Sequence, residues 1–397
     1  MIKNFLNTLE DPERPLLGPN YKFLIKMGML FPKNKLGRFF FYFLPHPVAV
    51  ITAAATFELY CVRTDLNTVL NNLKFSTLGL VILAKVKIFI FGQERWRKII
   101  EYVTEADKYE RLTCDEIRGR IIEKYTKFGR LVTYIHVVMT GLTFIAITAS
   151  PMLLYSSKTL RNNIRNGTAP FPHIVSMWTP FDKNQFPGIV ILITYQTLGA
   201  LWATGFMPAC DSIILVTMLF FGGKLELLRE RSKQMLGTDG KGISDEAANR
   251  ITGELHDAHV LLMEHMKMLN TIVSPVMFTY VFVCSLMICA SMFQVVNATT
   301  TFEKFILLQY LIFAIAQLFL FCWFSSELQR KNELVMLGPY ECQWWAANAR
   351  QRKNVMILAG QFSKVFIFTA GPFSNLSLEL FVSVVKGAYS FYTLLRD

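Results

Sequence analysis

Residues 131–155 read LVTYIHVVMTGLTFIAITASPMLLY and contain no Asp, Glu, Lys or Arg. A helix of about 20 mostly apolar residues is long enough to cross the hydrocarbon core of a bilayer. Residues 271–302 are equally free of these four charged residues. Two uncharged runs of this length predict a membrane protein.

The composition extends this prediction to the whole chain. Of 397 residues, 52% are apolar, 18% are charged and 34 are Phe. Soluble domains average about 25% charged residues, so an ordinary soluble enzyme is excluded, and the ample material for a core excludes a disordered chain. The fold class is therefore expected to be an all-α membrane protein with seven transmembrane helices. The expected spans are residues 39–57, 75–91, 131–155, 186–210, 271–302, 305–326 and 355–395.

The distribution of basic residues predicts how these spans are oriented. Residues 1–38, 92–130, 224–270 and 327–354 hold 29 of the 41 Lys and Arg, whereas the segments between them on the other side hold seven. Because cytoplasmic loops are enriched in Lys and Arg, we expect a cytoplasmic N-terminus and an extracellular C-terminus. The net charge of +12 is then explained without a nucleic-acid partner.

Two glycosylation sequons agree with this orientation. Asn166-Gly-Thr168 and Asn297-Ala-Thr299 both fall in segments assigned to the outside, so glycosylation is predicted at Asn166 and Asn297. The predicted topology is the reverse of that of a G-protein-coupled receptor. The chain also lacks the acidic-Arg-aromatic triplet that follows the third span of those receptors.

The charge pattern divides the chain into parts. The basic stretches also contain many acidic residues, which is typical of helices that project into water with ion pairs one turn apart. The predicted parts are a cytoplasmic N-terminal segment (1–38), a six-helix transmembrane bundle (39–326) with cytoplasmic helical extensions (92–130 and 224–270), a further cytoplasmic helix (327–354) and a last helix (355–397).

The last predicted span carries two ionisable residues. Glu379 and Lys386 are seven residues apart, which places them near one face of a helix. Charges at membrane depth are costly and usually face water or the protein interior, so this helix is predicted to line an aqueous path; a structural ion pair is the alternative. Gly371-Pro372 is expected to break the helix before it. The stretch around Ser390 mixes hydroxyls with large apolar groups, which suits a constriction that excludes water.

The sequence contains no recognisable catalytic or metal-binding arrangement. His256, His259 and His265 share one predicted helix but not in an H-E-x-x-H order, and the seven Cys show no metal-ligand spacing. We therefore expect neither an enzyme nor a bound metal or cofactor.

A ligand site is expected instead as an apolar cavity between the outer halves of the helices. For each candidate residue, ordinary helix packing is the alternative role. The candidates are Leu73, Phe75, Thr143, Phe144, Ile147, Ile191, Tyr195, Phe293, Tyr310 and Phe313.

The C-terminal third resembles the insect odorant receptor family. The residues that carry the resemblance are Leu376–Phe381, Lys386 and Tyr389–Leu395, with looser matches at Trp178–Asp182, Tyr195-Gln196, Asp211, His259, Ile288-Cys289, Tyr340, Trp344 and Trp345. The chain departs from the family pattern at Phe324-Ser-Ser-Glu327 and Gly338-Pro-Tyr340. The long cytoplasmic insertion of the shared co-receptor is absent, so the chain resembles an odorant-specific subunit.

The resemblance implies a function and partners. Members are ligand-gated, non-selective cation channels that assemble as hetero-tetramers with the co-receptor in the plasma membrane of sensory dendrites or cilia. The last helix of each subunit lines the pore, which would make 355–397 the pore-lining helix and place Leu394 at the gate together with Ser390. Residues 224–270 and the anchor helix 327–354 would form the cytoplasmic anchor between subunits. A small volatile odorant would bind in the outer half of the bundle, surrounded by lipid.

Two other functions remain as alternatives at this stage. A taste receptor of the same superfamily would share the topology but act without the co-receptor. A seven-span transporter would show inverted repeats with interrupted helices in both halves, and no such repeat is visible here.

Overall fold

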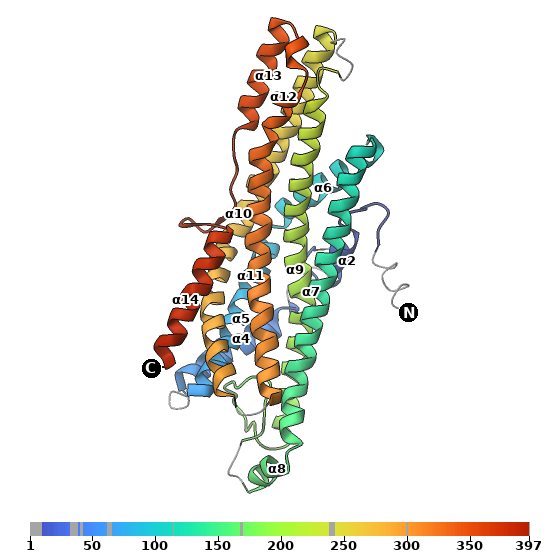
Figure 1. The fold of residues 1–397 in the computed structure, drawn as a ribbon. Helices are drawn as coiled ribbons and strands as arrows, with labels where there is room; N and C mark the ends of the chain where they lie inside the picture. The colour runs from blue at the N-terminus through green and yellow to red at the C-terminus, as the bar shows by residue number, and fades with distance from the viewer. Residues whose placement is uncertain are drawn as a thin grey trace.

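The computed structural model describes residues 10–31, 39, 43–61, 66–113, 115–166, 170–237, 243–298 and 301–396. These residues form a bundle of long helices with one small two-stranded hairpin (Figure 1). The elements are α2 (Gly18–Lys26), α4 (His46–Cys61), α5 (Leu66–Phe91), α6 (Gln93–Thr113), α7 (Glu116–Tyr155), α8 (Lys158–Arg165), α9 (Gly188–Lys233), α10 (Asp245–Asn297), α11 (Thr301–Val335), α12 (Leu337–Glu341), η1 (Trp344–Ala346), α13 (Ala349–Phe362), β1 (Thr369–Ala370), β2 (Ser374–Asn375) and α14 (Leu378–Arg396).

Four helices in the described part of the chain, α7, α9, α10 and α11, are long and apolar enough to cross a membrane. A fifth candidate is the pair formed by Asn72–Phe91 and Gln93–Thr113, which meet at an angle of 78°. These helices coincide with the predicted second to sixth spans. The first and last predicted spans correspond to α4 and α14, which are 16 and 19 residues long. A helical membrane protein is thus found, and the count of seven spans stays a prediction.

The predicted last helix over 355–397 was wrong in extent. α13 ends at Phe362 and a β-hairpin follows, so only α14 corresponds to the predicted pore-lining helix. Gly371 sits in the turn of this hairpin at φ +70°, a left-handed conformation that favours glycine. The Pro372 ring lacks the amide hydrogen that would continue a helix. The break expected at Gly371-Pro372 is therefore present, but it takes the form of a hairpin.

The predicted anchor helix over 327–354 was also wrong as a single element. α11 continues unbroken from the predicted sixth span to Val335, and α12, η1 and the first turns of α13 make up the rest. Pro339 is tolerated in α12 because it lies in the first turn, where its missing amide hydrogen costs little. The interruptions turn the chain back so that α13 packs beside α10.

The first two predicted spans begin at different residues in the structure. α4 begins at His46 and has Pro47 in its first turn, where proline is favoured. The predicted start at 39 falls partly on residues 40–42, which lie outside the described residues. α5 begins at Leu66, nine residues earlier than predicted. Lys74, which the charge count assigned to an outer loop, is therefore a buried residue of α5 at 6% exposure.

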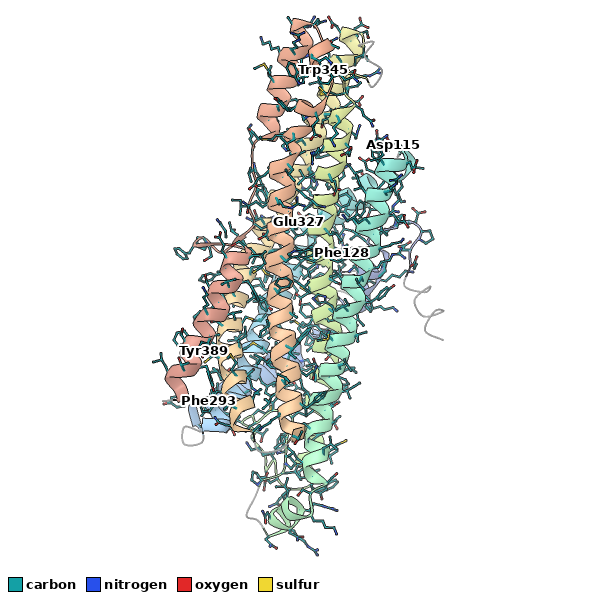
Figure 2. All side chains as sticks on the ribbon, in the orientation of Figure 1. Asp115, Phe128, Phe293, Glu327, Trp345 and Tyr389 are labelled. Carbon is teal, nitrogen blue, oxygen red and sulfur yellow. The ribbon has the colours of Figure 1, made fainter. Side chains whose placement is uncertain are left out.

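Some of the segments predicted to lie on opposite sides of the membrane are at opposite ends of the molecule. α12 and α13 lie at one end and α8 at the other (Figure 1). Trp345 lies at the α12–α13 end, and Phe293 lies toward the α8 end (Figure 2). Asn166 and Asn297 are exposed at the α8 end. The threonines of the two sequons, Thr168 and Thr299, lie outside the described residues.

α9 is the central helix of the bundle. Residues 206–218 of α9 are all buried, and it packs against α7, α10 and α11. Near its predicted cytoplasmic part, Lys224 forms a buried ion pair with Glu110 at 2.6 Å. The apolar core is therefore continuous from the predicted membrane region into the predicted cytoplasmic extension.

Candidate functional site

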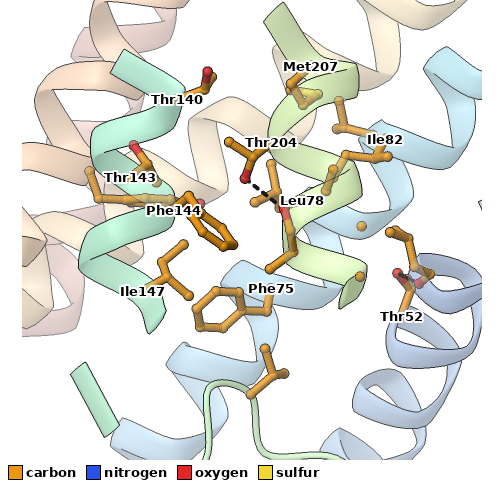
Figure 3. Close-up of a pocket in the computed structure, with 18 of the residues that line it drawn as sticks. Thr52, Phe75, Leu78, Ile82, Thr140, Thr143, Phe144, Ile147, Thr204 and Met207 are labelled. Carbon is orange, nitrogen blue, oxygen red and sulfur yellow. Dashed lines mark hydrogen bonds between the residues drawn. The ribbon is translucent and has the colours of Figure 1, made fainter. Parts of the chain in front are cut away.

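A cavity of about 160 Å³ lies between α4, α5, α7, α9, α10 and α11. Its lining is mainly apolar, and Ile174 and Val175 from the segment between α8 and α9 also contact it. Phe75, Phe144 and Ile147 point into this space from α5 and α7 (Figure 3). A cavity of about 150 Å³ lined by apolar side chains can hold a benzene molecule. The cavity thus suits a small, largely apolar ligand.

Helical periodicity brings each set of lining residues to one face. Residues three, four and seven positions apart share a side of an α-helix. α7 contributes Thr140, Thr143, Phe144 and Ile147 in this spacing. The lining residues of the other long helices follow the same rule: Phe75, Leu78, Gly79 and Ile82 on α5; Gln196, Gly199, Ala200, Ala203, Thr204 and Met207 on α9; Tyr280, Cys284 and Met287 on α10; and Tyr310, Phe313, Ala314 and Gln317 on α11.

Close packing of α4 against α5 depends on Gly79. A Cβ atom at Gly79 would lie 2.0 Å from Oγ1 of Thr52, which is far inside van der Waals contact. Glycine therefore lets Thr52 of α4 approach α5 and form one wall of the cavity. A larger residue here would push α4 outward.

The structure brings together six of the ten ligand-site candidates. They come from three helices that are distant in the sequence. The six that line the cavity are Phe75, Thr143, Phe144, Ile147, Tyr310 and Phe313.

The other four candidates, Leu73, Ile191, Tyr195 and Phe293, do not line the cavity. Tyr195 precedes the lining residue Gln196 by one position, and one residue rotates a side chain by about 100° around a helix. Ile191 is turned outward in the same way and is 54% exposed. In each case the helix does contribute other residues to the cavity lining, but the predicted side chain does not face the cavity.

Several lining residues were missed by sequence reasoning. Gln196 and Gln317 are polar residues within charge-poor runs, and this was a usable signal because polar groups at membrane depth are costly. Thr52 of α4 and Val175, which lies between α8 and α9, have no comparable feature in the sequence. Their position depends on tertiary packing alone.

The segment between α8 and α9 covers one side of the cavity and is held by Gln196. The Gln196 side-chain amide donates to the Val175 carbonyl at 2.7 Å, and its oxygen accepts from the Val175 amide at 3.4 Å. Lys183 of the same segment pairs with Glu58 of α4 at 2.8 Å, and Glu58 is 7% exposed. We call residues 173–183 the outer cover.

A buried charge cluster lies beside the opposite end of the cavity. The Lys85 ammonium pairs with Asp211 at 2.5 Å, and the Gln317 amide donates to the other Asp211 carboxylate oxygen. The Lys85 nitrogen also lies 5.0 Å from the centroid of the Tyr280 ring. Because Gln317 and Tyr280 line the cavity, any ligand there is separated from this cluster only by their side chains.

α14 presents a second candidate site, its outward face. Glu379, Lys386, Ser390 and Leu394 are all exposed and follow helical spacing. Phe381, Val384 and Ala388 on the other face pack against the bundle core. Among the described residues, neither Glu379 nor Lys386 takes part in an ion pair, so a salt bridge between them is not formed. The four predicted pore residues therefore share a face that the single subunit leaves uncovered.

Comparison with known proteins identifies the family. The family model described as 7tm Odorant receptor matches residues 65–389. Odorant receptor Or2 of Anopheles gambiae is 20% identical over 97% of this chain and 98% of its own length. The odorant receptor coreceptor of Aedes aegypti is 33% identical, but over only 22% of this chain and 18% of its own.

The fold agrees with this match. The olfactory receptor OR5 of Machilis hrabei, solved in complex with eugenol, superposes with a TM-score of 0.81 at 16% identity, covering 96% of this chain and 98% of that chain. The prediction of a non-enzymatic odorant receptor is therefore confirmed, as is the assignment to the family rather than to transporters. The chain belongs to the 7tm odorant receptor family, a family of helical membrane proteins of olfaction.

Proposed function

We propose that this chain is the odorant-binding subunit of a ligand-gated, non-selective cation channel. The observation that carries the proposal is the small apolar cavity enclosed by six helices and the outer cover. A volatile molecule would bind there, and the pore would be lined by the outward face of α14, with Leu394 at its gate. The receptor would reside in the plasma membrane of sensory dendrites or cilia.

The partner in this proposal is the odorant receptor co-receptor, in a hetero-tetramer embedded in lipid. The match to the coreceptor covers a limited part of the chain, whereas the match to Or2 is almost full length. This contrast supports the role of an odorant-specific subunit. The uncovered face of α14 is the surface that neighbouring subunits would meet around a pore.

Binding opens the channel only if the ligand has a higher affinity for the open arrangement than for the closed one. A ligand of about ten heavy atoms held by apolar contacts has limited binding energy, so affinity is expected to be modest. A ligand in the cavity would contact helices α9, α10 and α11 at once. Helices α10 and α11 pack against α14. A small displacement of α10 or α11 would therefore also displace α14, the proposed pore helix.

The test is two-electrode voltage-clamp recording of the chain with and without the co-receptor against an odorant panel. An odorant-evoked cation current only in the paired expression supports the proposal. Current from this chain alone would favour a self-sufficient, taste-type receptor. The absence of any evoked current, with both subunits at the cell surface, would refute the channel function.

A matched pair of substitutions tests the position of the site. Ala203 lines the cavity, whereas Leu201, two residues away on α9, is 55% exposed on the outside of the bundle. Ala203→Trp should abolish the response by filling the cavity, and Leu201→Trp should preserve it. Equal effects of the two substitutions would place the ligand elsewhere.

A further inference from the structure

The hydrogen-bonding groups that line the cavity are mostly engaged with the protein. The threonine hydroxyls donate to carbonyls one turn earlier, as Figure 3 shows for Thr204. Gln196 is bound to the outer cover and Gln317 to Asp211. The other threonine bonds are Thr52 to Val48 at 2.7 Å, Thr140 to His136 at 2.8 Å and Thr143 to Met139 at 2.9 Å.

Two lining residues differ from this pattern. The hydroxyl groups of Tyr280 on α10 and Tyr310 on α11 are buried and have no hydrogen-bond partner among the described residues. A phenolic hydroxyl is a good donor, and a buried donor left unpaired lowers stability. Phenylalanine would supply the same ring contacts without that cost. In the described part of the chain, the two hydroxyls are therefore unpaired phenolic donors on residues that line the cavity.

The surroundings of the two tyrosines distinguish them. The Cys284 sulfur, one turn along α10 from Tyr280, is a weak acceptor within reach of the Tyr280 hydroxyl. The Tyr280 ring also faces the Lys85 ammonium. In the described part of the chain no acceptor is found for the Tyr310 hydroxyl, although the Lys74 ammonium lies 5.6 Å from the centroid of its ring. Tyr310 lies one turn from the lining residue Phe313. Tyr310 is thus the stronger candidate to donate to a ligand.

We propose that the ligand of this receptor carries an oxygen acceptor, such as a ketone, aldehyde, ester or ether, on an otherwise apolar body, and that Tyr310 donates a hydrogen bond to it. This inference rests on the proposed function, because it names the chemical class of ligand for the same cavity. A hydrocarbon of the same shape would fill the cavity but leave the Tyr310 hydroxyl unpaired. The acceptor should therefore raise potency roughly tenfold over an isosteric hydrocarbon.

The experiment uses matched ligand pairs that differ only at the acceptor. One such pair is acetophenone and α-methylstyrene, in which C=CH2 replaces C=O; a panel of small ketones and esters with their hydrocarbon isosteres supplies others. Dose–response curves are recorded for the receptor with its co-receptor. The variants are Tyr310→Phe, Tyr280→Phe and, as a control, Tyr195→Phe, because Tyr195 does not line the cavity.

The expected result is a roughly tenfold preference for the oxygenated member in the wild type. Tyr310→Phe should remove the preference by lowering the potency of the oxygenated member, and surface expression of the variant, measured separately, shows that it is folded. Tyr195→Phe should keep the preference. Equal potency of the pairs in the wild type, or a preference that survives Tyr310→Phe, would overturn the proposal.

A failure of the proposed function is recognisable separately. In that case no member of the panel evokes current, whatever its chemistry. Ligand-induced thermal stabilisation of the purified receptor complex then decides the inference on its own. Stabilisation by the oxygenated members that Tyr310→Phe removes supports the hydrogen bond, and equal stabilisation by both members of each pair contradicts it.

Discussion

The Lys85 ammonium lies 2.5 Å from a carboxylate oxygen of Asp211, and the two side chains are 0% and 2% exposed at the centre of the bundle. This ion pair joins α5 to α9, and Gln317 adds α11 through the second carboxylate oxygen. Breaking a buried ion pair by removing one partner leaves the other charge without compensation. One buried network of an ion pair and a hydrogen bond therefore joins α5, α9 and α11, the helices that form much of the cavity.

Removal of either charge should destabilise the receptor strongly. We expect Lys85→Met or Asp211→Asn to lower the free energy of unfolding by about 3–5 kcal/mol, because one buried charge remains unpaired. The double variant Lys85→Met/Asp211→Asn should be far less affected, since no charge remains and the introduced amide oxygen can still accept from Gln317. Thermal unfolding of the detergent-purified receptor measures all three. A double variant as unstable as the sum of the single ones would show that the pair is not coupled.

The sequence predicted this region only in part. Asp211 stood out as the lone charge in the long apolar run from residue 186 to 223, but its partner could not be named. Lys85 is 126 residues away, and only the packing of α5 against α9 brings the two together. Local features such as the long apolar helices α7, α9, α10 and α11 and the break at Gly371-Pro372 depend on neighbouring residues, so they were predictable.

The cavity shows the same limit. Sequence reasoning selected the correct helices and six lining residues, because aromatic and hydroxyl groups in charge-poor runs are visible locally. It placed Ile191 and Tyr195 on the lining face of α9, whereas the lining face is that of Gln196 and Gly199. Contacts of α9 with α4, α5 and the outer cover decide which of its residues face the cavity. These contacts leave no periodic trace in the sequence.

Loosening the outer cover should shorten the time for which the ligand stays bound. Gln196→Leu removes both hydrogen bonds to Val175 while keeping the side-chain size, and each bond contributes about 1 kcal/mol. We expect current deactivation after odorant removal to become roughly tenfold faster. Thr194→Leu is the control, because Thr194 is exposed on the same helix and does not line the cavity. Unchanged deactivation in Gln196→Leu would mean that the ligand leaves by another route.

The buried imidazole of His259 should make the receptor sensitive to acid. His259 is 0% exposed and lies 4.7 Å from Phe362 between ring centroids. Burial, with smaller effects of His256 and Lys364, lowers the pKa of His259 to about 4. The unfolded chain protonates its histidines near pH 6.5, so the unfolded state binds the proton first as the pH falls. Stability is therefore fully present above pH 6.5 and declines towards pH 4.

The size of this loss follows from the pKa difference. It amounts to about 3 kcal/mol of unfolding free energy between neutral pH and pH 4. His259→Leu should remove this part of the pH dependence while retaining the contact with Phe362. Melting temperatures of the two proteins measured from pH 7.5 to 4.5 provide the comparison. Parallel curves would show that His259 does not contribute.

The outward face of α14 makes a prediction about ion conduction. If this face lines a cation path, the Lys386 ammonium repels the permeating ions, and Lys386→Gln should raise single-channel conductance roughly twofold. Lys364→Gln is the control, because Lys364 is also exposed but precedes the hairpin and lies outside α14. Conductance and reversal potential are measured in the paired receptor with a saturating odorant. If Lys386→Gln conducts like the wild type and Lys364→Gln does not, the path runs past the hairpin rather than along α14.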